Sequence, residues 1–220
     1  MSLIDTVEFR PKLVLFDLDG TLLDSLPDLY AASLSMAKSL DIAAPTHTQV
    51  EQWVGNGAAM LVQRILADQF SPVAVDPRFD AALSLYMEAY HQLGNQQSRL
   101  YDGVVPLLTM LQSQGIKQGV ITNKPSRFTK PLLQQFGILG YFELVYCGDT
   151  FDEKKPHPMP LINAAKALGL EINDCLMVGD SSNDIIAAKT CGMPSVGVRG
   201  GYNHGRDVSE CEPDWVLDCL

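Results

Sequence analysis

The chain contains 220 residues, carries a formal net charge of −10 at pH 7, and is 46% hydrophobic. This length fits one large domain, or a core with a smaller insert, and the composition is that of a globular protein with a substantial core. The negative charge argues against nucleic acid or an anionic membrane as the main partner, although a pocket can still be locally positive for a small anion.

The first predicted element is a strand over residues 13–17, an apolar run that ends in a carboxylate. Only helical patterns follow it until residue 97, so we predict a helical subdomain at residues 25–97, inserted after the first strand. The polar stretch GNQQSR at 94–99 is predicted to be the linker that returns to the core.

Beyond this linker, short apolar runs alternate with helical patterns. Runs rich in Val, Ile, Leu and Phe, without polar alternation, are typical of parallel strands buried on both faces. The alternation predicts an open, doubly wound α/β sheet. The predicted strands span 118–122, 142–147, 175–180, 195–199 and, more weakly, 214–218, and the predicted helices span 104–115, 126–137, 160–169 and 182–192.

Asp17 and Asp19 follow the first predicted strand, and they face the same way if the strand extends that far. Two carboxylates ~4 Å apart repel each other by roughly 4 kcal/mol at an effective dielectric constant of ~20. A turn after the strand is the simpler interpretation, but ligand sites of open α/β sheets lie beyond the carboxyl ends of the strands. We therefore expect a cation or a chemical role here.

Polar side chains also follow the later predicted strands. Thr122 ends one of them and Asn123 follows, and a hydroxyl together with backbone N–H groups at this place suits a phosphate oxygen, although an isolated threonine often simply begins a loop. Asp180 ends another strand, while Asp184 lies in the first turn of the next helix, where capping is the alternative role. Lys155 precedes prolines that stiffen its loop and orient its ammonium group.

Together these strand ends offer carboxylates and no histidine or cysteine. Carboxylates are the ligands that suit Mg²⁺. Mg²⁺, a lysine and a threonine around a carboxylate suit an anion with several oxygens, above all phosphate. Asp17 is then the candidate nucleophile. Asp19 is the candidate acid that protonates the leaving oxygen and the base that later activates water.

The motifs DLDGTLLDS, ITN, KPHP and GDSSND occur in an order that resembles the haloacid dehalogenase-like hydrolases across nearly the whole chain. The resemblance implies a Rossmann-like core at 1–24 and 98–220, with a helical cap at 25–97. It also implies Asp17 as nucleophile, Asp19 as acid/base, and Thr122 and Lys155 as phosphate ligands. The magnesium ligands it implies are Asp17, the backbone carbonyl of Asp19 and Asp180, with Asp184 orienting them.

Asp19 favours phosphoryl transfer, because the dehalogenase branch of the family lacks this second aspartate. DSLPDL and the stretch WVGNGAAMLVQRIL at 53–66 are similar to phosphoglycolate phosphatases. Gly55 and Asn56 are candidates for a tight turn that presents N–H groups to the substrate, with an ordinary interhelical turn as the alternative. Arg64 is a candidate for a substrate carboxylate, against the commoner case of a solvent-facing arginine.

Other functions fit parts of the pattern. A phosphatase of another small metabolite (a sugar phosphate, a nucleotide or pyrophosphate) and a phosphosugar mutase share the same core. A phosphoacceptor receiver module also uses an aspartate, Mg²⁺, a threonine and a lysine, but it has neither a helical insert nor two aspartates on one strand. We further expect the linkers at 23–25 and 94–98 to hinge, so that the cap excludes water.

Five scattered cysteines without a Cys-x-x-Cys pair predict free thiols in a reducing cytosol. The N-terminus has no signal pattern, and no apolar run approaches the ~20 residues needed to span a bilayer. We therefore expect a cytoplasmic monomer or homodimer whose partner is a small phosphorylated metabolite.

Overall fold

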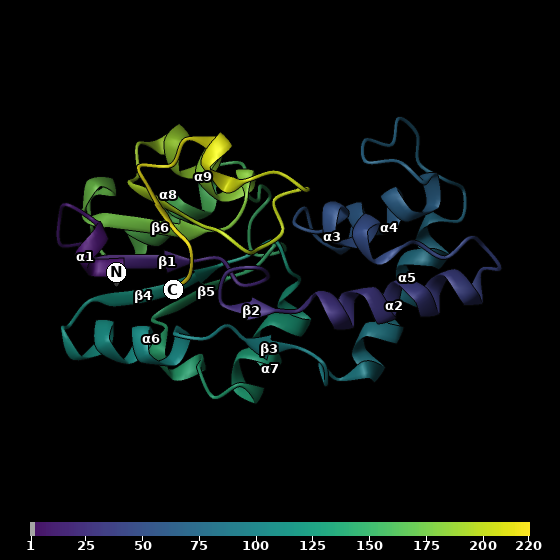
Figure 1. The fold of residues 1–220 in the computed structure, drawn as a ribbon, viewed down its shortest axis with the longest axis horizontal. Helices are drawn as coiled ribbons and strands as arrows, with labels where there is room; N and C mark the ends of the chain where they lie inside the picture. Colours follow the sequence, from purple (N-terminus) through teal and green to yellow (C-terminus); the bar gives the residue numbers. More distant parts are fainter. Residues whose placement is uncertain (1–2) are drawn as a thin grey trace.

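The structure, a computed structural model, describes residues 3–220, and a six-stranded parallel sheet forms its centre (Figure 1). The strand order is β5-β4-β1-β6-β7-β8, which places β1 and β6 side by side in the middle. The expected α/β fold is thereby confirmed. The strands are β1 (Leu13–Phe16), β4 (Lys117–Ile121), β5 (Leu144–Tyr146), β6 (Cys175–Gly179), β7 (Ser195–Val198) and β8 (Trp215–Leu217).

Alternate residues of the central strands enter two different hydrophobic cores. On β1, Val14 and Phe16 pack in the cluster that contains α6 (Val104–Ser113) and α7 (Ser126–Gln135). Leu13 and Leu15 pack in the cluster that contains α8 (Met159–Ala167) and α9 (Ser182–Cys191). Burial on both faces explains why these strands are apolar without alternation.

Most predicted strands and helices are present, with ends displaced by one or two residues. The first strand was expected to include residue 17, but β1 ends at Phe16, so Asp17 and Asp19 lie on the loop that follows rather than on one strand face. Six very short elements were not predicted. They are α1 (Leu3–Thr6), the strands β2 (Leu23–Asp24) and β3 (Arg99–Leu100), and the 3₁₀ turns at 139–141, 172–174 and 208–211.

Four helices form a second lobe beside the sheet, which we call the helical lobe (residues 26–93; Figure 1). They are α2 (Leu26–Ser39), α3 (His47–Trp53), α4 (Ala58–Ala67) and α5 (Phe79–Leu93). The lobe has its own apolar cluster, which two aromatic residues of the sheet domain, Phe128 and Tyr202, also join.

Two chain crossings connect the lobes, and they are held together locally. Strands β2 and β3 pair in antiparallel fashion, Leu23 opposite Leu100. The buried carboxylate of Asp28 accepts hydrogen bonds from the backbone N–H of Gln97 and from both N–H and Oγ of Ser98, at 2.6–3.1 Å for its Oδ2. The start of α2 is therefore fastened to the returning linker.

Candidate active site

The carboxyl ends of three neighbouring strands bring the predicted polar residues together. β1 pairs with β4 on one side and with β6 on the other, with parallel register on both sides. Asp17, Thr122 and Asp180 each follow directly after one of these strands. Residues more than 150 positions apart in the sequence thus meet because the sheet topology aligns the ends of their strands.

Three carboxylates form one compact cluster. Asp17, Asp180 and Asp184 each offer an oxygen atom, and these atoms lie within 4.8 Å of one another. Burial raises the pKa of Asp17 well above its ordinary value, Lys155 opposes this rise, and Asp184 and Asp180 add to it. Burial, followed by repulsion from Asp184, raises the pKa of Asp180 to about 7. The cluster therefore gathers more negative charge than its surroundings neutralise.

Lys155 is the cation at this cluster. Its Nζ lies 2.9 Å from Oδ1 of Asp17 and 2.6 Å from Oδ1 of Asp184, and its side chain is almost fully buried. These two carboxylates outweigh the cost of burial and raise the pKa of Lys155, so it stays charged. The predicted lysine thus contacts the predicted nucleophile.

Local structure explains the position of Asp184. Ser181 and Asp184 form a capping box at the start of α9, in which Oδ2 of Asp184 accepts hydrogen bonds from N–H and Oγ of Ser181. Both of its oxygens are thereby engaged, one by the helix cap and the other by Lys155. The two interpretations of Asp184, capping and site orientation, are compatible in one side chain.

Asp180 is held from two sides. One of its carboxylate oxygens accepts a hydrogen bond from Oγ1 of Thr21 at 2.6 Å, and the other accepts one from the backbone N–H of Tyr202 at 2.7 Å. Gly20 and Gly201 allow this close approach, because a Cβ on either would come within 2.3 Å of Oδ2 of Asp180.

Asp19 lies near this cluster but is not one of its members. Its carboxylate accepts a hydrogen bond from Ser25 at 2.6 Å and pairs with Lys124 at 3.0 Å. Asp17 and Asp19 both line the same cavity, as the sequence predicts. The two carboxylates have different partners, however, since Asp17 binds Lys155 and Asp19 binds Lys124.

Thr122 and Asn123 also line this cavity. The Thr122 hydroxyl accepts a hydrogen bond from the backbone N–H of Lys124 at 3.1 Å. The Asn123 amide donates to the carbonyl oxygens of Gly55 and Lys155 at 2.9 and 2.8 Å. Asn123 therefore joins the helical lobe, the lysine loop and the sheet.

The turn at residues 54–57 docks the helical lobe on the sheet domain. Gly55 and Gly57 line the cavity with φ angles of +113° and +86°, which favour glycine. The Asn56 side chain instead contacts Asn183, its Nδ2 donating to Oδ1 at 2.9 Å, and its carbonyl oxygen accepts from Nζ of Lys154 at 3.0 Å. Asn56 is thus a docking residue in this structure.

Arg64 does not reach the cavity, contrary to the expectation that it meets a substrate carboxylate. Its Nε and Nη1 donate to the carbonyl oxygens of Phe70 and Trp53 at 2.8 and 2.6 Å, and its guanidinium lies 4.2 Å from the centre of the Phe70 ring. Because these two carbonyl oxygens accept its hydrogen bonds, the guanidinium group is buried and stabilises the helical lobe instead of facing solvent.

Lys124, Tyr86 and Tyr90 line the cavity too, and the sequence did not single them out as site residues. Lys124 follows directly after the ITN motif, which is the one signal that marked it. Tyr86 and Tyr90 belong to the helical apolar pattern of α5, where an aromatic residue reads simply as core.

The oxygen donors fit a hard divalent cation. Among residues 3–220, the cluster of possible metal ligands consists of three carboxylates and includes no histidine or cysteine, which favours Mg²⁺ over zinc or copper. Burial and then repulsion among the carboxylates raise the pKa values of Asp17 and Asp180 although Lys155 opposes the rise, and a bound cation would oppose it further.

Comparison with known proteins defines the class. The family model of haloacid dehalogenase-like hydrolases matches residues 14–198. A phosphoglycolate phosphatase of Nitrosococcus oceani is 41% identical over 96% of this chain and 94% of its own, and phosphoglycolate phosphatase 1 of Pseudomonas aeruginosa is 44% identical over 96% and 77%. The chain therefore belongs to the haloacid dehalogenase-like hydrolase family, as its motifs predicted.

A solved structure agrees with this assignment. The crystal structure of a predicted phosphoglycolate phosphatase from Haemophilus somnus superimposes with a TM-score of 0.89 at 35% identity, covering 97% of this chain and 96% of that one. The similarity spans both the sheet and the helical lobe. Among residues 3–220, no helix combines the length and the apolar character that a membrane crossing requires.

Proposed function

We propose that this hydrolase is an Mg²⁺-dependent phosphomonoesterase whose substrate is 2-phosphoglycolate. The observation that carries the proposal is the pairing of two neighbouring aspartates with two separate lysines at one cavity. Lys155 and a bound Mg²⁺ would together keep Asp17 as an anion that can attack phosphorus, and Asp19 is placed to exchange a proton. The phosphoglycolate phosphatases named above support the choice of substrate.

In the first step, an Asp17 carboxylate oxygen attacks phosphorus, and the bond between phosphorus and the ester oxygen breaks. Asp19 donates its proton to the departing oxygen, which leaves as the hydroxyl of glycolate. In the second step, Asp19 takes a proton from water, and the resulting hydroxide attacks the aspartyl phosphate. Inorganic phosphate leaves and the Asp17 carboxylate is restored.

Both contacts that the structure gives the Asp17 carboxylate, from Lys155 and from the N–H of Leu18 at 2.7 Å, fall on Oδ1. No described residue donates a hydrogen bond to Oδ2, so one oxygen stays available. The Thr122 hydroxyl, the backbone N–H of Asn123 and the Lys155 ammonium are the proposed phosphate ligands, as donors that stabilise charge on the equatorial oxygens.

Asp17 and Asp180 would hold Mg²⁺ directly, together with the carbonyl of Asp19, while Asp184 would orient the site through Lys155. The ion would neutralise charge on the phosphoryl oxygens and on the clustered carboxylates. In this proposal residues 25–97 act as a cap over a core formed by residues 1–24 and 98–220, in a cytosolic monomer or homodimer with free thiols.

The cavity favours a small leaving group over the larger alternatives. Its volume is about 50 Å³, and apolar residues from the helical lobe close one side of it. A two-carbon acid fits such a space better than a sugar or a nucleoside does. A phosphosugar mutase, which must turn a sugar over within the site, is disfavoured for the same reason.

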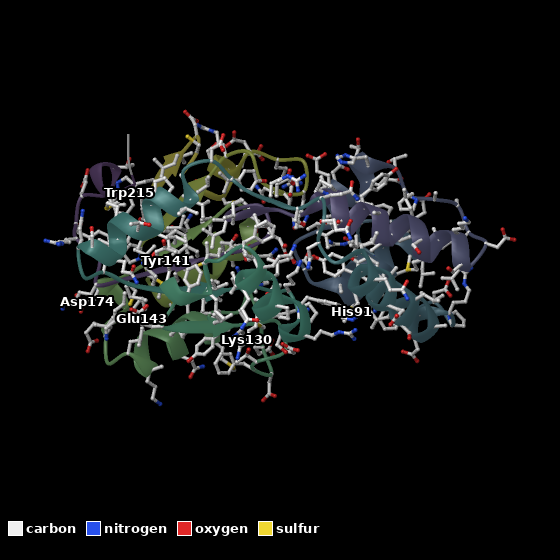
Figure 2. All side chains as sticks on the ribbon, turned by 90° about the horizontal axis from the view of Figure 1, so that it is seen from below. His91, Lys130, Tyr141, Glu143, Asp174 and Trp215 are labelled. Atoms are coloured by element: carbon white, nitrogen blue, oxygen red, sulfur yellow. The ribbon has the colours of Figure 1, made fainter. Side chains whose placement is uncertain are left out.

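The test is Asp17→Asn, measured by phosphate release from a panel of phosphorylated metabolites with and without Mg²⁺. We expect wild type to prefer 2-phosphoglycolate and the variant to lose turnover by about 10³-fold or more while its circular dichroism spectrum is unchanged. Asp174→Asn is the matched control, because Asp174 pairs with Lys12 on the surface (Figure 2) and should change activity little. Full Mg²⁺-dependent activity in Asp17→Asn would refute the mechanism.

A further inference from the structure

Two buried tyrosine hydroxyls in the cavity have no partner. Tyr86 and Tyr90 are 1% and 2% exposed, and neither hydroxyl has a partner at hydrogen-bond distance in the part of the chain that the structure describes, although Lys124 lies close enough to Tyr90 to oppose the rise that burial causes in its pKa. Both residues line the cavity that Asp17 and Asp19 also line. A buried hydroxyl without a partner is costly, so a ligand that accepts hydrogen bonds is its natural complement.

The same side of the cavity carries a buried ammonium group. Lys124 is 5% exposed, and its Nζ lies 3.0 and 3.2 Å from the Asp19 carboxylate oxygens and 4.8 Å from the centre of the Tyr90 ring. The ammonium group therefore lies between one carboxylate and an aromatic face, inside the cavity wall.

Among the described residues, Lys124 pairs with a single carboxylate, that of Asp19. Lys155 differs in this respect, since two other carboxylates pair with it. The other residues of the cavity on the helical lobe, such as Leu29, Val54 and Leu61, are apolar and offer no compensating charge.

We propose that Lys124, Tyr86 and Tyr90 form a subsite for a carboxylate on the leaving group. This inference rests on the proposed phosphatase function and specifies its substrate class as small phosphomonoesters with a carboxylate one methylene away from the ester oxygen. The spacing follows from the contacts, because Asp19 must reach the ester oxygen and Lys124 touches Asp19. An ammonium that touches Asp19 lies close enough to meet a carboxylate one methylene away from the ester oxygen.

The test compares 2-phosphoglycolate with ethyl phosphate, which has the same length but no carboxylate, in Lys124→Met, Tyr86→Phe and Tyr90→Phe. Losing Lys124 should lower kcat/KM on both substrates, through Asp19, but roughly 10- to 100-fold more on 2-phosphoglycolate. Each Tyr→Phe variant should lower it about 3- to 10-fold more on 2-phosphoglycolate than on ethyl phosphate. Inhibition of ethyl phosphate hydrolysis by glycolate should weaken in parallel.

Lys130→Met and Tyr141→Phe are the matched controls, because neither residue lines the cavity: Lys130 is exposed, and Tyr141 is half-buried with its hydroxyl bonded to Thr109 (Figure 2). Each Tyr→Phe change in the cavity should also raise the Tm of the ligand-free protein, since it removes an unpaired buried hydroxyl. An equal loss on both substrates in all three variants overturns the subsite while leaving the phosphatase function intact. A wild type without preference for 2-phosphoglycolate over ethyl phosphate overturns both proposals.

Discussion

Charge balance around single residues governs this site. Asp17, Asp180 and Asp184 share one ammonium group, that of Lys155, so folding brings like charges together in a buried place. Burial is the main cause that raises the pKa values of Asp17 and Asp180, and repulsion within the cluster adds to the rise, so these carboxylates hold protons more tightly. Proton binding and metal binding therefore compete for the same carboxylates.

The first prediction concerns pH. The pKa of Asp180 is about 7 in the folded chain, against 3.8 as its ordinary value, so the folded state binds more protons between these pH values. The free energy of unfolding of the metal-free protein should then fall as pH rises from about 4 to 7. Because Mg²⁺ needs deprotonated ligands, its stabilising shift in Tm should be larger at pH 8 than at pH 5.

Thermal unfolding with Mg²⁺ and with a chelator at both pH values measures this effect. In Asp180→Asn, the stability of the metal-free protein should depend less on pH, and most of the increase in Tm that Mg²⁺ causes should disappear. An equal Mg²⁺ shift at pH 5 and pH 8 would contradict the role of these carboxylates.

A second prediction concerns Lys155. Removing the ammonium in Lys155→Met leaves Asp17 and Asp184 buried without a cation, which should lower the free energy of unfolding by about 3 kcal/mol or more in a chelator at pH 8. Urea denaturation measures the loss, and Mg²⁺ should restore part of it. The control is the neighbouring Lys154→Met, which removes one hydrogen bond to the carbonyl of Asn56 and should cost about 1 kcal/mol.

At the scale of elements, much of the architecture was predictable because buried parallel strands and amphipathic helices leave strong patterns. All six strands of the parallel sheet were predicted. Paired strands of two residues, such as β2 and β3, carry no periodicity and become visible only through their pairing. Asp17 and Asp180 were predictable because strand ends of one sheet converge.

The other site residues show where sequence patterns stop being informative. Tyr86 and Tyr90 were predicted as apolar positions of a helix, and nothing local indicates that their hydroxyls lack partners. Arg64 was a candidate for a substrate carboxylate, with a solvent-facing arginine as the alternative. Neither describes it, because the carbonyls of Trp53 and Phe70 that bind it are brought together only by folding. These properties arise from packing between elements, not from spacing within one.

The docking turn gives a prediction at this scale. Asn183, on α9, donates to the carbonyl oxygen of Gly55 at 3.3 Å and accepts from Asn56 at 2.9 Å. Asn183→Ala should loosen the contact between the helical lobe and the sheet domain, raising KM several-fold and speeding hydrogen exchange at residues 52–58. Asn163→Ala removes a comparable side-chain hydrogen bond within α8 and should change neither.

Across the whole molecule, one residue links the carboxylate cluster to the connection between the lobes. The backbone N–H of Tyr202 donates to Asp180, while its hydroxyl donates to Asp24 on β2 and accepts from the N–H of Leu26 at 3.1 Å. Its ring also packs in the apolar cluster of the helical lobe. Binding of an ion at the carboxylate cluster and the position of the helical lobe are therefore physically connected through Tyr202.

This connection leads to a prediction about closure. If the lobe closes over bound phosphate, adding Mg²⁺ and orthovanadate should slow hydrogen exchange at residues 52–58 and in the linkers at 23–25 and 94–98, while β6 and β7 are protected in both states. Tyr202→Phe keeps the N–H that binds Asp180 but loses the hydroxyl bonds to Asp24 and Leu26, so protection of the linkers should shrink while vanadate still binds. Identical exchange in both linkers with and without ligand would show instead that the lobes are fixed, and substrate would then have to enter through fluctuations of the docking turn alone.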